Sequence, residues 1–211
     1  MQLRLSSTLT FEQYVTMQAW RQATLPACPL CLPGTCRLEP LAPYLRKVPA
    51  VAFVARFYCR AQHTTISLLP DFYASRVPGL LDDIEHAAEV AEAGSGTEHT
   101  AETLRPADAS DAITLGAAVA WVRRRVAWVR EVLAIVGSLF PDLFAGVARS
   151  VGAFRAHLET SSVLVALRGI CERHLHVLPR PLGLNPRMPV ARPRRRAPRQ
   201  SMGPDPPAEA G

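Results

Sequence analysis

The sequence contains little lysine, few aromatic residues and no long uncharged segment. Lys47 is the single lysine among 24 basic residues, a skew that a GC-rich genome produces, so arginine content alone does not indicate a site. Aromatic residues make up 7% of the chain. The longest uncharged run near the middle, 132–141, covers about half the length of a membrane span. We therefore predict that no transmembrane helix is present.

Signals for secretion and for common enzymatic chemistry are also missing. The first residues contain no apolar core with a small-residue cleavage site, which predicts a cytoplasmic, reducing location. We find no Gly-rich phosphate loop, nucleophile elbow or HExxH motif. Asp71, Asp82, Asp83 and Glu85 are interpreted as a solvated helix face, because no alternating β/α series follows to gather them. The sequence predicts a non-catalytic protein without a small-molecule substrate.

Charge is distributed in blocks along the 211 residues, whose net charge is +6. Residues 1–81 carry +5, residues 82–111 carry −8, residues 112–178 carry +4 and residues 179–211 carry +5. With 48% hydrophobic residues, most of the chain is expected to fold into one or two small domains. The pattern predicts a basic head, an acidic linker, a helical body and a basic tail.

Four of the five cysteines lie in the head. Cys28 and Cys31 form a C-x2-C pair, a spacing at which a tight turn directs two sulfurs at one metal ion. Cys59 and His63 supply a second pair, C-x3-H, so we predict a structural Zn²⁺ held by these four residues. Cys36 is an alternative that could replace Cys31. The competing interpretation is that the cysteines are small buried hydrophobic residues.

The predicted fold class is α+β, mostly α, with a small N-terminal β zinc ribbon, a helical body and a disordered Pro/Arg-rich tail. Strands are expected over 48–58 and 64–69, and amphipathic helices over 121–139, 143–158 and 160–177. The predicted segments are an N-terminal segment (1–23), the zinc ribbon (24–70), a connecting helix (71–93), an acidic linker (94–110), a helical domain (111–178) and the tail (179–211).

A resemblance to a known family rests on the run Arg56-Phe57-Tyr58-Cys59 and on His63 to Phe72, which contains Ser67-Leu68-Leu69-Pro70-Asp71-Phe72. These residues resemble a signature of small bacterial zinc-ribbon proteins that are often labelled transposase-related. The helix that begins Trp121-Val122-Arg123-Arg124-Arg125 is similar to one in the same group. The resemblance implies bound zinc and an association with mobile elements, with a transposase as a protein partner.

Basic residues in two places predict nucleic-acid binding, with DNA as the expected ligand. Arg123, Arg124 and Arg130 lie opposite the apolar stripe of the 121–139 helix. The tail adds a cationic arm made of Arg192, Arg194, Arg195, Arg196 and Arg199. Arg125 falls within the apolar arc and is interpreted as a snorkelling side chain. The alternative is a protein–protein interaction module, in which Trp121 and Trp128 contact a partner.

Overall fold

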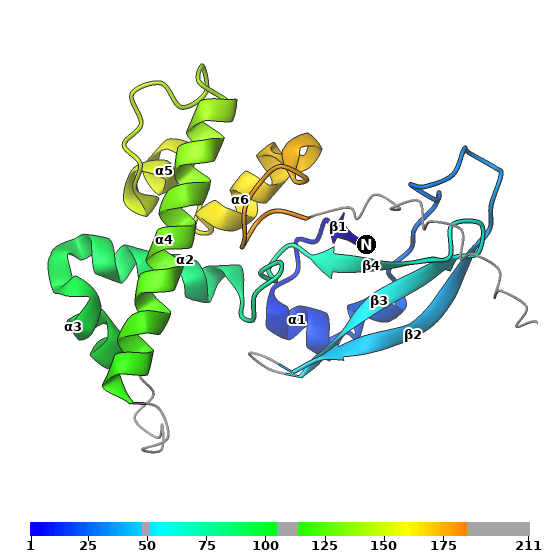
Figure 1. Cartoon of the computed structure of the whole chain (residues 1–211), viewed down its shortest axis with the longest axis horizontal. Helices are drawn as coiled ribbons and strands as arrows, with labels where there is room; N and C mark the ends of the chain where they lie inside the picture. Colours follow the sequence, from blue (N-terminus) through cyan, green and yellow to red (C-terminus); the bar gives the residue numbers. More distant parts are fainter. Residues whose placement is uncertain (48–50, 105–113, 185–211) are drawn as a thin grey trace, which may run out of the picture.

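A computed structural model describes residues 1–47, 51–104 and 114–184 of the chain. A twisted sheet forms one side of the molecule, and most of the helices gather on the other (Figure 1). Within the described ranges, no helix combines the length and apolar character needed to cross a membrane.

The sheet has four strands in the order β1-β4-β3-β2. The strands span Gln2–Leu5 (β1), Leu38–Arg46 (β2), Ala52–Cys59 (β3) and Thr64–Pro70 (β4). β1 runs parallel to β4, whereas β2–β3 and β3–β4 are antiparallel. The α-ammonium of Met1 donates a hydrogen bond to the Thr65 carbonyl at 2.9 Å, which extends the β1–β4 pairing to the start of the chain.

Successive side chains of β3 point alternately to the two faces of the sheet. Val54 is fully buried and belongs to the main core, together with Leu69 of β4. Phe53 and Phe57 occupy alternate positions of the strand and so lie on the opposite face, as does Cys59. The sheet therefore presents one face to the helical body and the other to the loop that precedes β2.

Six α-helices lie outside the sheet in the part of the chain that the structure describes. They are α1 (Phe11–Thr16), α2 (Leu81–Val90), α3 (Gly96–Thr103), α4 (Leu115–Leu139), α5 (Val151–Leu158) and α6 (Val163–Ile170). Short 3-10 helices span Ala19–Arg21 and Glu172–His174, and a π-helical turn, Ala91–Ser95, joins α2 to α3. Thr10 and Gln13 form a capping box at α1, and the Thr114 hydroxyl accepts a hydrogen bond from the Ala117 amide at the start of α4.

One hydrophobic cluster joins the sheet to the helices. It contains Val54 of β3, Ile84 of α2, Leu133 of α4, Phe154 of α5 and Leu164 of α6, all fully buried. A smaller cluster forms where α3 packs on α4. The helical body and the inner sheet face therefore share one core.

A buried arginine connects α6 to the segment that follows β4. Arg168 is fully buried, and its guanidinium donates hydrogen bonds to the carbonyl oxygens of Asp71 (2.8 Å), Tyr73 (2.7 Å) and Pro181 (3.0 Å). Burial lowers the pKa of Arg168 to about 10, so the side chain stays charged at neutral pH. Arg4 of β1 binds the Asp71 carboxylate through two nitrogens, at 2.8 and 2.9 Å.

Glu85 performs a similar role at the start of α6. Its buried carboxylate accepts hydrogen bonds from the amides of Val163 (3.0 Å) and Leu164 (2.8 Å) and pairs with Arg155 at 2.8 Å. A carboxylate at a helix N-terminus satisfies amides that have no partner within the helix. Asp71 and Glu85 are thus structural, and the predicted solvated face is wrong for these two residues, whereas Asp82 and Asp83 are exposed.

The predicted fold class is wrong about the β region. The expected small N-terminal ribbon is instead a four-stranded mixed sheet, with α1 before β2 and the remaining helices after β4. β1 was not predicted, because it has only four residues and its partner strand lies more than 60 residues away in sequence. β2 was not predicted, because Pro40 and Pro43 suggest a loop, although an edge strand tolerates proline.

Several helical boundaries also differ from expectation. Residues 96–103, expected to belong to a polar linker, form α3, in which Thr100 and Ala101 are buried. The helix expected over 143–158 begins only at Val151, because a loop with Gly146 at φ 73° follows α4. Leu182 and Leu184, expected in a disordered tail, are buried in the main core. The remainder of that tail, from residue 185, lies outside the described residues.

Candidate metal centre

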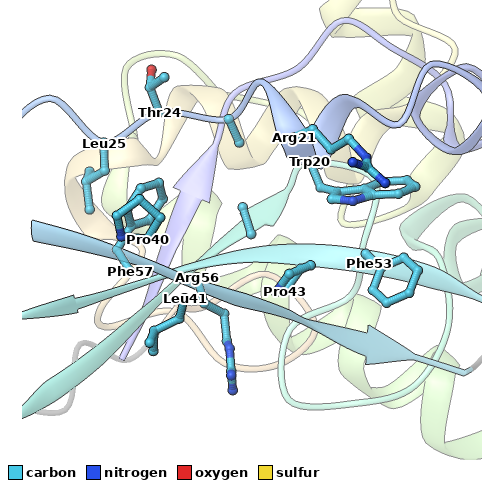
Figure 2. Close-up of a pocket in the computed structure, with 12 residues that line it drawn as sticks. Trp20, Arg21, Thr24, Leu25, Pro40, Leu41, Pro43, Phe53, Arg56 and Phe57 are labelled. Atoms are coloured by element: carbon cyan, nitrogen blue, oxygen red, sulfur yellow. The ribbon is translucent and has the colours of Figure 1, made fainter.

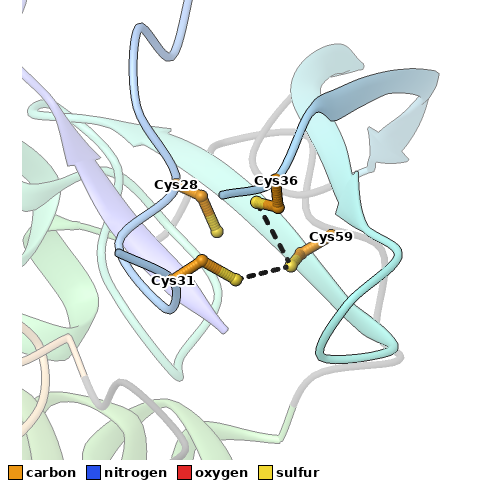
Figure 3. Close-up of side chains that lie close together, drawn as sticks. All are labelled: Cys28, Cys31, Cys36 and Cys59. Carbon is orange, nitrogen blue, oxygen red and sulfur yellow. Dashed lines mark hydrogen bonds between the residues drawn. The ribbon is translucent and has the colours of Figure 1, made fainter. Parts of the chain in front are cut away.

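The four cysteines of the head come together between a loop and the end of a strand. Cys28, Cys31 and Cys36 lie in the loop before β2, and Cys59 is the last residue of β3 (Figure 3). Cys59 is fully buried, whereas the other three side chains are half-buried. β3 positions the sulfur of Cys59. The loop folds back over the outer face of the sheet and places the other three sulfurs beside it.

Turns in the loop direct its cysteines inward. Pro29 and Leu30 form a turn between Cys28 and Cys31, and a second turn follows, in which the Thr35 amide donates to the Leu32 carbonyl at 3.0 Å. Gly34 adopts φ 78° in that second turn, a conformation that residues with a Cβ rarely adopt. The second turn reverses the chain, so that Cys36 points back at the first two sulfurs.

The sulfur positions match a four-coordinate metal site. The four Sγ atoms all lie within 4.8 Å of one another, and this is the only such ligand cluster within the described part of the chain. The Sγ of Cys59 is 3.6 Å from that of Cys31 and 3.8 Å from that of Cys36. A tetrahedral ion with metal–sulfur bonds of about 2.3 Å requires sulfur separations of about 3.8 Å. Disulfide bonding, with sulfurs about 2.05 Å apart, does not occur among these cysteines.

The close approach of the four thiols shifts the pKa values of Cys28, Cys31 and Cys36. Burial alone raises the pKa of Cys28, but a backbone hydrogen bond at Leu30 and the three neighbouring thiols outweigh it and lower the pKa overall. Burial and then the adjacent thiols raise the pKa of Cys36. Burial also raises the pKa of Cys31, with contributions from Cys59 and Cys28. Ionisation of one thiol thus opposes ionisation of its neighbours, and a bound cation would relieve that opposition.

His63 is not part of this cluster. It lies in the turn between β3 and β4 with a left-handed backbone (φ 47°), and its ring Nδ1 is hydrogen-bonded to the Tyr58 hydroxyl at 3.1 Å. Tyr58 and Cys59 are consecutive strand residues, so their side chains leave opposite faces of the sheet. The structure thus brings together Cys28, Cys31 and Cys59 with Cys36, while the His63 ring lies by Tyr58.

The arginines predicted to contact nucleic acid are accessible where the structure describes them. Arg123, Arg124 and Arg130 are exposed on α4. Arg192, Arg194, Arg195, Arg196 and Arg199 lie outside the described residues. Arg125 is buried, and its guanidinium lies 3.3 Å from the centroid of the Trp121 ring, a cation–π contact. Burial lowers the pKa of Arg125 to about 10.

Comparison of the chain with protein-family models, with curated proteins and with solved structures returns no match. The resemblance to bacterial zinc-ribbon proteins therefore stays a prediction. The metal centre is supported by its own geometry: four cysteine sulfurs within reach of one ion.

Proposed function

We propose that the protein binds one structural Zn²⁺ through Cys28, Cys31, Cys36 and Cys59. The sulfur separations of 3.6 and 3.8 Å carry this proposal, because they fit tetrahedral thiolate coordination. Four thiolates favour Zn²⁺ among common divalent ions, and four protein ligands leave no position for water or substrate. The ion would fasten the loop to the end of β3 without taking part in catalysis.

Metal analysis of purified protein tests this ligand set. We expect about one zinc per chain, and loss of that zinc in Cys36→Ser and in Cys59→Ser. Cys171→Ala is the matched control, because Cys171 is buried in the helical core and should leave zinc content unchanged. His63→Ala should also retain zinc. Zinc loss in His63→Ala together with full retention in Cys36→Ser would contradict the four-cysteine site and restore His63 as a ligand.

We further propose that the protein binds DNA through the exposed arginines of α4. Arg123 and Arg130 are two helical turns apart on one face, and Arg124 flanks them. Within the described residues none of the three forms an ion pair, so all three remain available for phosphates. An association with transposition rests on the resemblance alone, and a transposase gene beside this one would support it.

Binding to a mixed-sequence DNA duplex tests the role of α4. We expect affinity to fall steeply between about 50 and 200 mM salt, and to weaken further in an Arg123→Gln/Arg130→Gln variant. Arg173→Gln, an exposed arginine elsewhere, serves as the charge-matched control. If the duplex does not bind at low salt, the alternative of a protein-interaction module replaces this proposal.

A further inference from the structure

A groove opens on the outer face of the sheet, close to the cysteine cluster. Its volume is about 650 Å³, and it lies between β2, β3 and the segment around Trp20 to Leu25 (Figure 2). That segment leads directly into the loop that carries Cys28, Cys31 and Cys36. The same loop therefore forms one wall of the groove and three-quarters of the candidate metal centre.

Three aromatic rings line the groove. Trp20 and Phe53 lie with ring centroids 5.3 Å apart, and Phe57 follows further along β3. Phe53 is 36% exposed, a large value for a phenylalanine in an inner strand of the sheet. Tyr14 holds the end of the groove at Phe53 in place, because its ring packs against Trp20 and its hydroxyl donates a hydrogen bond to the Phe53 carbonyl at 3.1 Å. The rings are held in place and remain partly accessible to a ligand.

The charge around the groove is positive. Arg21 lies beside the Trp20 ring, whereas the Arg56 side chain leaves the opposite face of β3, where its Nε donates to the Ala42 carbonyl at 3.0 Å (Figure 2). Neither arginine forms an ion pair with a described residue, and no carboxylate is among the described residues that line the groove. Glu39 is the single acidic residue between positions 17 and 62, against six basic ones. A ligand that fits must combine flat apolar groups with negative charge.

The edge strand argues against an extended peptide as that ligand. Peptides commonly add to a free sheet edge through backbone hydrogen bonds. β2 is the edge strand beside the groove, but Pro40 and Pro43 have no N–H to donate, and the β2–β3 register shifts between Leu41 and Tyr44. Side chains must therefore carry recognition at this face, and those present include three aromatic rings and the guanidinium group of Arg21.

We propose that this groove binds single-stranded nucleic acid, with bases stacking on Phe53, Phe57 and Trp20 and phosphates contacting Arg21. Stacking on rings along a cationic groove is the general mode by which proteins bind single strands without reading sequence. This assignment extends the proposed DNA binding, but its residues are distinct from the arginines of α4. An experiment can therefore contradict the groove proposal without contradicting the α4 proposal, and the reverse.

Fluorescence anisotropy with a labelled oligothymidine of about 15 nucleotides tests the assignment on the full chain. We expect Phe57→Leu and Phe53→Leu each to weaken binding by about tenfold or more, because each removes a stacking ring. Arg21→Gln should weaken binding several-fold and reduce its dependence on salt. Phe57→Tyr keeps a ring and should bind like the wild type. Circular dichroism and zinc content confirm that each variant is folded.

The arginine variant of α4 distinguishes the two proposals. Arg123→Gln/Arg130→Gln should weaken duplex binding and leave oligothymidine binding unchanged. If the wild type binds duplex but not oligothymidine, or if both ring variants bind oligothymidine as tightly as the wild type, the groove assignment is overturned while duplex binding stands. If a synthetic peptide of alternating glutamate and phenylalanine binds in place of oligothymidine, the groove belongs to a protein partner.

Discussion

The two faces of the sheet are stabilised by different physical means. The inner face packs on a core of fully buried side chains, reinforced by the buried groups of Arg168 and Glu85. The outer face is covered by a loop of little regular structure, whose cysteines are only half-buried. Apolar burial can hold the helical body, but none of residues 22–37 in the loop is fully buried, so apolar burial holds the loop only weakly. A bound metal ion would supply the missing attachment.

The largest expected effect concerns the inner face. Arg168→Leu leaves the carbonyls of Asp71, Tyr73 and Pro181 without their buried donor, so we expect a loss of about 3–5 kcal/mol in the free energy of unfolding. Chemical denaturation of the whole chain measures this loss. Arg173→Leu removes an exposed arginine three residues from α6 and should change stability by less than about 0.5 kcal/mol. Similar values for the two variants would mean that Arg168 does not anchor this face.

Metal removal should affect the outer face far more than the inner one. With a chelator, or in Cys59→Ser, we expect rapid tryptic cleavage at the exposed Arg21 and Arg37, which flank the loop, while α4 to α6 stay protected. Limited proteolysis followed by mass spectrometry locates the cuts. Cys171→Ala should show the opposite pattern, with an intact loop and a less stable body. Global unfolding on chelation would show that the two faces are not independent.

The smallest effect is a pH dependence within the helical body. Burial raises the pKa of Glu92, although its carboxylate accepts a hydrogen bond from the Val151 amide at 2.9 Å. A carboxyl whose pKa is raised in the folded state binds its proton more tightly there than in the unfolded state. Its contribution to folding stability is therefore most favourable at low pH, and it declines as pH rises from the unfolded-state pKa through the folded-state pKa. Glu92→Gln should remove that decline and slightly stabilise the protein at neutral pH. Thermal melts from pH 4 to pH 7 compare the two proteins, and parallel curves would argue against this account.

Sequence patterns identified the elements whose signals are local. β3 and β4 were predicted from their β-branched and aromatic runs, and α4 from its helical period. α3 has a polar sequence and is held by packing of Thr100 and Ala101 against the α4 side of the body, which no local signal shows.

The metal centre was anticipated only in part. Spacing indicated that Cys28, Cys31 and Cys59 belong near one another, because the C-x2-C turn and the end of a strand can be inferred from sequence. It could not indicate toward which face of the sheet the His63 ring would turn, so His63 was predicted as the fourth ligand and Cys36 only as an alternative to Cys31. The useful signal was Gly34, which allows the second turn and returns Cys36 to the other sulfurs.

The parallel pairing of β1 with β4 has a consequence for the order of folding. During synthesis β1 emerges before its partner strand and before the Asp71 carboxylate that binds Arg4, both of which lie more than 60 residues further along the chain. Arg168, which fixes the backbone after β4, follows almost 100 residues after that. Contacts between such distant positions slow folding, because a long loop must close before they form. β1 is thus expected to be secured late in folding, because its partner strand and the residues that fix that strand are made long after it.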